Sequence, residues 1–129
     1  MANQPLILIA DDDAAFREIF STKLSAEGYR IETAEDGKIA VQKTQALKPD
    51  LVLMDVNMPV MDGAAATLAI RAIPEIKDTK IAFLTSLGDP QLEVQNFNSN
   101  ISKNFGAQGY LRKTDDLDSL AAQIKQFLL

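Results

Sequence analysis

The sequence predicts a doubly wound α/β fold, in which helices cover both faces of a parallel sheet. Three observations predict it: five short apolar runs, longer segments of helical pattern between them, and turn or cap residues at the junctions. Because parallel strands must be joined by crossover connections, which are usually helices, this alternation indicates a (βα)5 chain. The five runs are Leu6–Ala10, Tyr29–Thr33, Leu51–Met54, Ile81–Thr85 and Gly109–Arg112.

The first two segments between the runs have the pattern of amphipathic helices. Ala14–Ala26 places apolar side chains at helical spacing, and Gly28 follows at the position where a glycine commonly ends a helix. Asp36 is suited to cap a second helix, which we expect to end near Leu47 because Pro49 lies just beyond it.

Three further helices are expected. The third follows Gly63 and is closed by Pro74, and the last is capped by Asp115 or Asp116. Its buried stripe would consist of Leu117, Leu120, Ala121, Ile124, Phe127 and Leu128.

A fourth helix is expected between the fourth and fifth runs. Asp89 and Pro90 supply an N-cap and a first-turn proline, and Gly106 is suited to end the helix. The intervening Gln95–Asn100 is rich in poor helix formers, so we expect this helix to be broken or preceded by an extended loop.

Among doubly wound strand orders, 2-1-3-4-5 is the flavodoxin-like order that suits five βα units. It sets the first and third strands side by side at the topological switch point, and ligands bind at their carboxyl ends. Residues 1–129 contain no segment with the composition of a linker, so we expect a single domain without an output domain.

Composition excludes several classes of function. Lys and Arg number 13 against 18 Asp and Glu, a net charge of −5, so direct nucleic-acid binding is not expected. Cysteine and histidine are absent, which excludes disulfides, thiolate or imidazole metal sites and histidine-dependent triads. The apolar runs are far shorter than the roughly 20 residues of a membrane span. We therefore expect a cytoplasmic protein.

Acidic residues follow the first and third runs. Asp11, Asp12 and Asp13 come directly after the first, and Asp55 comes after the third. Any one of them alone is most simply a solvated loop charge. Because the predicted order brings at least three carboxylates to one crevice, their repulsion requires a counter-ion, and Mg²⁺ with its oxygen ligands is the natural one.

A hydroxyl and an ammonium are expected at the same edge. Thr85 and Ser86 end the fourth run, and Lys113 follows the fifth. Taken singly, a strand-ending threonine and a loop lysine are ordinary residues. Beside Asp55 and a metal, however, they complete a site for phosphoryl transfer, with a carboxylate as nucleophile and cations that neutralise the phosphoryl oxygens.

Four stretches carry a resemblance to a known family: Ile7–Asp13, Leu53–Gly63, Leu84–Ser86 and Gly109–Lys113. In this order they resemble the signatures of receiver domains of two-component response regulators, and the similarity spans nearly the whole chain. The resemblance implies that Asp55 is the phosphoacceptor and that Thr85 and Tyr110 are the switch residues. It also implies that Lys113 binds the phosphoryl group. The implied ligands of Mg²⁺ are Asp11, Asp12, Asp55 and the backbone carbonyl of Asn57.

Partners are also implied by the resemblance. The phosphoryl donor would be a phospho-histidine of a sensor histidine kinase or of a histidine phosphotransfer protein. The signal would pass to a downstream protein target through a surface that phosphorylation changes. We expect no membrane contact, and a monomer or weak dimer.

The sequence departs from the family in two places. Thr114 follows Lys113, where the family usually has a proline, often in a cis peptide; a trans bond is expected here. The stretch between Thr85 and Lys113 is several residues longer than usual. It is either a tolerated surface insertion or a variable part of the face that carries partner contacts in the family.

The residues argue against two rival functions. A haloacid-dehalogenase-like phosphohydrolase also uses an aspartyl phosphate and Mg²⁺, but it usually places a second aspartate two positions after the nucleophile, where this chain has Asn57. The second rival is an adaptor that works independently of phosphorylation, and the complete set of acidic, hydroxyl and lysine residues argues against it.

Overall fold

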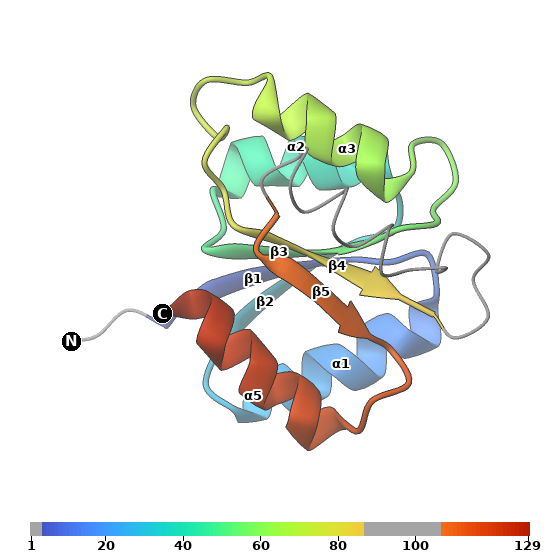
Figure 1. Ribbon diagram of the computed structural model, residues 1–129, viewed down its shortest axis with the longest axis vertical. Helices are drawn as coiled ribbons and strands as arrows, with labels where there is room; N and C mark the ends of the chain where they lie inside the picture. Colours follow the sequence, from blue (N-terminus) through green and yellow to red (C-terminus); the bar gives the residue numbers. More distant parts are fainter. Residues whose placement is uncertain (1–3, 87–106) are drawn as a thin grey trace.

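A computed structural model describes residues 4–86 and 107–129. They form a five-stranded parallel sheet in the order β2-β1-β3-β4-β5 (Figure 1), which confirms the predicted strand order. The elements are β1 (Leu6–Ala10), α1 (Ala14–Ala26), β2 (Arg30–Ala34), α2 (Gly37–Leu47), β3 (Leu51–Asp55), α3 (Gly63–Arg71), β4 (Ile81–Thr85), β5 (Gly109–Arg112) and α5 (Leu117–Leu128).

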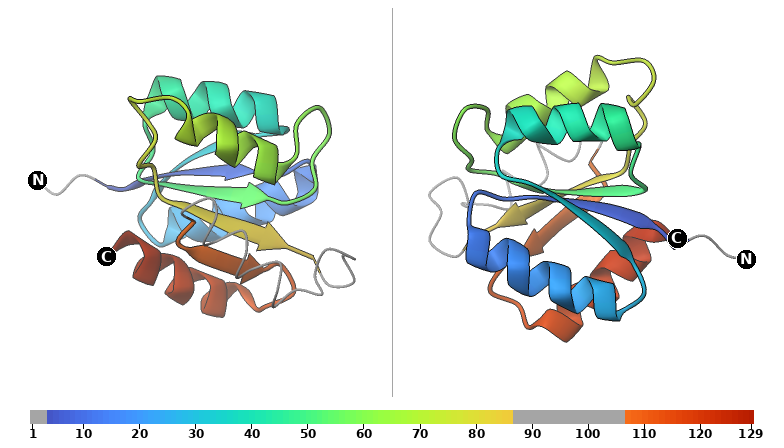
Figure 2. Two further views of the ribbon diagram at one scale, coloured as in Figure 1. Left: turned by 45° about the horizontal axis from the view of Figure 1, so that its top comes forward. Right: turned by 180° about the vertical axis from the view of Figure 1, so that it is seen from behind.

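Helices cover both faces of the sheet, with α1 and α5 on one side and α2 and α3 on the other (Figure 2). Successive residues of a strand point to opposite faces, so each strand contributes to two separate apolar cores. In β3, Val52 and Met54 pack on the α2 and α3 side, whereas Leu51 and Leu53 pack on the α1 and α5 side. Every residue of β3 and β4 is buried, as expected of central strands in a parallel sheet.

Each described helix begins at an aspartate whose side chain accepts hydrogen bonds from backbone N–H groups of the first turn. Such caps satisfy N–H groups that have no partner within the helix, and their negative charge lies at the positive end of the helix dipole. Of the two caps that the sequence allowed for α5, the structure uses Asp116. The four N-cap residues are Asp13, Asp36, Asp62 and Asp116.

Three predicted elements have different bounds in the structure, and one predicted helix lies outside the described residues. β2 spans Arg30–Ala34, one residue later than the apolar run, and β3 includes Asp55. α3 ends at Arg71, before the turn that contains Pro74. The expected fourth helix after Asp89 falls among residues 87–106. None of the helices within residues 4–86 and 107–129 has the length and hydropathy of a membrane span.

Candidate functional site

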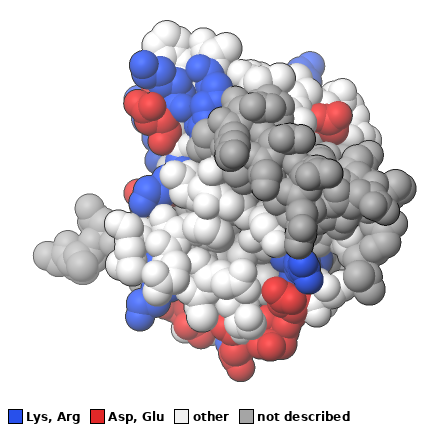
Figure 3. Space-filling model, in the orientation of Figure 1, with Lys and Arg blue, Asp and Glu red and all other residues white. Residues whose placement is uncertain are grey.

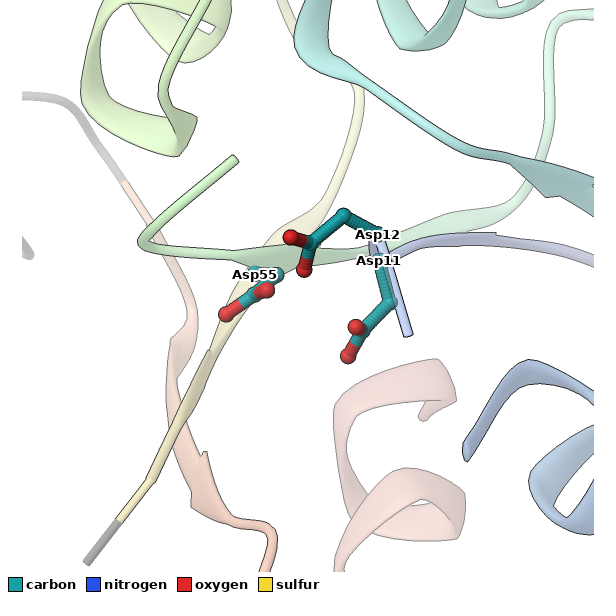
Figure 4. A group of neighbouring side chains, drawn as sticks. All are labelled: Asp11, Asp12 and Asp55. Carbon is teal, nitrogen blue, oxygen red and sulfur yellow. The ribbon is translucent and has the colours of Figure 1, made fainter. Parts of the chain in front are cut away.

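The carboxyl ends of β1 and β3 lie side by side at the switch point of the sheet. Asp11 and Asp12 follow β1, and Asp55 is the last residue of β3. One carboxylate oxygen from each of these side chains lies within 4.8 Å of the others (Figure 4). Asp11 and Asp55 are buried, and Asp12 is exposed. The three acidic groups that the strand order was expected to bring together do converge.

The third aspartate of the run has a different place. Asp13 caps α1 by accepting hydrogen bonds from the N–H groups of Ala15 (3.0 Å) and Phe16 (3.3 Å). Its own N–H donates to Oδ1 of Asp11 at 2.9 Å, and the guanidinium of Arg17 donates to the Asp11 backbone carbonyl at 2.8 Å. The first turn of α1 therefore fixes the backbone and side chain of Asp11.

The loop between β3 and α3 is held by two close approaches. A Cβ added to Gly63 would overlap the carbonyl oxygen of Asp55, and one added to Gly37 would overlap the carbonyl oxygen of Met61. Only glycine permits such contacts between backbones. Asn57 is exposed in this loop, whose α3 end packs tightly against both β3 and α2. Its backbone carbonyl as a metal ligand stays a prediction.

Lys113 brings a positive charge between the two buried carboxylates. Its N–H donates to the Thr85 carbonyl at 2.8 Å, which ties the end of β5 to the end of β4. Its Nζ pairs with Oδ2 of Asp11 and, at 3.3 Å, with Oδ2 of Asp55. The peptide bond to Thr114 is trans, as are all peptide bonds of the described chain. The expectation of a trans bond at this position is confirmed.

The two predicted switch residues lie on neighbouring strands. Thr85 is buried at the end of β4, and its hydroxyl donates to the carbonyl of Leu111 in β5 at 3.3 Å. Tyr110 lies beside Phe83 in the β4–β5 register and packs, half-buried, against the core on the α2 and α3 side. In this state the Thr85 hydroxyl is therefore engaged with β5.

Burial and neighbouring charges shift the pKa values of two groups in the site. Burial raises the pKa of the Asp55 carboxyl to about 7, the negative charge of Asp11 adds to this effect, and Lys113 opposes it. Burial lowers the pKa of the Lys113 ammonium, but its hydrogen bond to Asp11 and the charges of Asp55 and Asp11 outweigh burial. The pKa of Lys113 therefore lies above its ordinary value, and an additional cation would favour the ionised form of Asp55.

The donor set of this acidic site fits a hard divalent cation. Its three carboxylates are oxygen donors close enough to share one ion, and Lys113 supplies one positive charge against three negative ones. Mg²⁺ prefers oxygen ligands and is usually bound by one or two carboxylates together with water and phosphate oxygens. The described residues can therefore hold such an ion.

Two residues that contact the site were not identified from the sequence. Phe16 places its ring under Lys113, with the Nζ atom 4.9 Å from the ring centroid, and Arg17 binds the Asp11 carbonyl. Both lie in the first turn of α1, directly after the cap at Asp13. Their position in the sequence is the one signal that could have identified them. A helix that follows a strand at the switch point begins beside the crevice, so residues of its first turn can reach the site.

Comparison with protein families gives a match over residues 7–125 to the model described as the response regulator receiver domain. The DNA-binding dual master transcriptional regulator RpaA of Synechocystis is 33% identical over 124 residues, which cover 96% of this chain and 49% of that protein. Response regulator MprA of Mycolicibacterium vanbaalenii is 34% identical over 122 residues, which cover 95% of this chain and 49% of that protein. The chain thus spans about half the length of the curated relatives it matches.

Solved structures match the fold over nearly the whole chain. The chemotaxis response regulator CheY4 of Vibrio cholerae has a TM-score of 0.83 and 33% identity, with 97% of this chain and 99% of that chain covered. A CheY-like receiver domain protein of Methanospirillum hungatei has a TM-score of 0.83 and 27% identity, with 98% of this chain and 94% of that chain covered. The arrangement of strands and helices is therefore shared with receiver domains.

Proposed function

The chain belongs to the family of response regulator receiver domains, signalling domains that share a phosphoacceptor role, and from that premise we propose that Asp55 accepts a phosphoryl group from a phospho-histidine. The observation that carries the proposal is the placement of Asp55. Its carboxylate lies buried at the end of β3, close to the carboxylates of Asp11 and Asp12 and paired with the ammonium of Lys113. This arrangement combines a nucleophile with cation-binding and anion-binding groups, which phosphoryl transfer requires.

In the proposed reaction a carboxylate oxygen of Asp55 attacks phosphorus in line with the leaving imidazole. The O–P bond forms as the P–N bond breaks, and the departing imidazole nitrogen takes up a proton from water. Lys113 turns its ammonium from the two carboxylates to the transferred phosphoryl oxygens, since these now carry the larger negative charge. Thr85 leaves the carbonyl of Leu111 and donates its hydroxyl to another of these oxygens.

Mg²⁺ belongs to this proposal as the cation of the acidic site. We assign Asp12 and Asp55 as direct ligands, Asp11 as a ligand mainly through water, and the backbone carbonyl of Asn57 as a further oxygen. When bound, the ion supplies positive charge to the phosphoryl oxygens as charge develops on them. The chain's own contribution is to hold the carboxylates close together, which α1 does for Asp11 through its first turn.

The signal in this proposal leaves through β4 and β5. Phosphorylation adds about −1.5 to −2 charges at neutral pH, and drawing the Thr85 hydroxyl toward Asp55 breaks its bond to β5. Tyr110 lies on that strand and can move into the space that Thr85 leaves. A protein partner then meets a changed face without a large movement of the backbone.

The proposed unit is one cytoplasmic receiver domain that acts through proteins. The donor is a sensor histidine kinase or a histidine phosphotransfer protein, and the output is a downstream protein target. The net charge of −5 disfavours contact of these 129 residues with nucleic acid. In Figure 3, the Lys and Arg side chains of the described residues form separate groups on the face shown, not one continuous basic area.

Intact-mass measurement after incubation with acetyl phosphate and Mg²⁺ tests the proposal. We expect the wild-type chain to gain one phosphoryl mass and Asp55→Asn to gain none. Asp62→Asn is the matched control, because it removes an exposed aspartate that caps α3 and lies outside the acidic site. Full phosphorylation of Asp55→Asn would refute the assignment, and a gain of mass that does not depend on Mg²⁺ would refute the role of the metal.

A further inference from the structure

The ring of Phe16 forms one wall of the space that holds the Lys113 ammonium. Nζ of Lys113 lies 4.9 Å from the ring centroid, within the range of a cation–π contact. Behind it, the ring of Phe20 packs at 5.1 Å between centroids with an interplanar angle of 46°. Phe20 is fully buried in the core on the α1 and α5 side, so Phe16 is supported from beneath.

One residue links this ring to the acidic site. The carboxylate of Asp13 accepts the N–H of Phe16, and the N–H of Asp13 donates to Asp11. Asp13, the N-cap of α1, therefore positions two of the groups that surround the Lys113 ammonium. They are the Asp11 carboxylate and the Phe16 ring. The third group, Asp55, comes from β3.

The lysine itself cannot fix its own position. Its stem is long and flexible, and two carboxylates attract the ammonium without selecting one geometry. An aromatic face adds attraction along the ring normal and blocks movement toward α1, and it offers no hydrogen bond that would compete with a phosphoryl oxygen. We propose that Phe16 is a positioning residue for Lys113, which holds the ammonium where it meets the phosphoryl group transferred to Asp55. This inference rests on the proposed function.

The simpler interpretation is that Phe16 only fills space, since it is a half-buried side chain packed against the core. The two interpretations differ in what they require of the ring. Space filling requires its volume, whereas positioning of an ammonium requires the negative electrostatic face. Ring fluorines reduce the negative electrostatic potential of the face stepwise while the shape of the ring changes little. Fluorination therefore distinguishes positioning from space filling.

The decisive experiment introduces phenylalanine with one to five ring fluorines at position 16 by site-specific incorporation. The rate of phosphorylation by acetyl phosphate is measured at saturating Mg²⁺. We expect the rate to fall stepwise with each fluorine, reaching a loss of about 2- to 30-fold, the range that a cation–π contact spans. An unchanged rate across the series would overturn the proposal.

Natural substitutions give a second readout. Phe16→Leu should slow phosphorylation by a similar factor, and Phe16→Trp should restore it because tryptophan offers the strongest cation–π face. Phe127→Leu is the matched control, since it makes the same change at another half-buried ring on the same core. An equal rate in Phe16→Leu and Phe127→Leu would assign Phe16 to packing alone.

Nuclear magnetic resonance separates failure of this inference from failure of the proposed function. The methylene protons next to Nζ of Lys113 should show an upfield ring-current shift that disappears in Phe16→Leu but persists in Phe127→Leu. The measurement needs neither Mg²⁺ nor phosphorylation. If the shift is absent while the wild-type chain is phosphorylated, only the positioning role fails; if the shift is present and no variant is phosphorylated, the proposed function fails.

Discussion

The substitution Asp55→Asn should stabilise the metal-free protein, and more so at high pH. The folded chain raises the pKa of Asp55 to about 7, from an ordinary value of 3.8. Since the folded state binds this proton more tightly than the unfolded state, the free energy of unfolding falls as pH rises from the unfolded pKa through the folded one. Asparagine has the same shape and carries no charge at any pH, so the variant does not incur this loss.

The magnitude follows from the shift. A difference of about 3 pKa units corresponds to about 4 kcal/mol once both states are ionised. About 2 kcal/mol of this is lost between roughly pH 5.5 and pH 8.5, because the remainder is lost closer to the unfolded pKa. The advantage of Asp55→Asn over the wild type should therefore grow by about 2 kcal/mol across that interval.

Urea unfolding in the presence of a chelator measures this difference. The free energy of unfolding of both proteins is measured at the two pH values, and the difference between variant and wild type is compared between them. This comparison removes any effect of the substitution that does not depend on pH. Asp62→Asn controls for the loss of an exposed carboxylate. If Asp55→Asn has the same advantage at both pH values, the pKa of Asp55 is not raised in the folded protein, and the effect of burial and of Asp11 on this carboxyl is refuted.

Three further predictions follow from the same geometry. Mg²⁺ affinity should rise from about pH 6 to about pH 8, because binding must release the proton of Asp55; calorimetry in buffers of different ionisation enthalpy counts that proton, and no release would contradict the expectation. Val60 is 76% exposed and has a φ of 69°, a left-handed conformation that costs a β-branched residue about 1–2 kcal/mol, so Val60→Gly should raise the free energy of unfolding by about 1 kcal/mol in urea titrations. Gly63→Ala should lower it by about 1–3 kcal/mol and slow phosphorylation, because the new methyl group would displace the Asp55 carbonyl; a variant as stable as the wild type would show that the loop adapts freely.

Sequence alone was sufficient for the architecture because the apolar runs mark the central strands. β1, β3 and β4 are buried on both faces, so nearly every residue in them is apolar and their ends are visible. The predicted second strand begins one residue before β2, which lies at the edge of the sheet. There Arg30 and Glu32 are exposed, and the apolar pattern that would mark its limits is weaker.

The candidate site was predictable in its components but not in its contacts. Strand order alone predicts that Asp11, Asp12 and Asp55 converge, since parallel strands end at the same edge. It does not show that Asp13 turns away to cap α1, which depends on where the helix begins. Nor does it show the position of a long lysine side chain, because rotamers are chosen by the surrounding packing and charges rather than by local sequence.

The contacts of Lys113 and Thr85 provide a route by which the proposed phosphorylation of Asp55 would act on another face of the domain. The Lys113 N–H bonds the Thr85 carbonyl, while the Thr85 hydroxyl bonds the Leu111 carbonyl, so both residues join β4 to β5 at the same end. Both also carry the groups that the proposed reaction draws toward the phosphoryl oxygens. In the proposed mechanism their movement would act on the junction of β4 and β5, and Tyr110, the predicted switch residue, lies half-buried on β5.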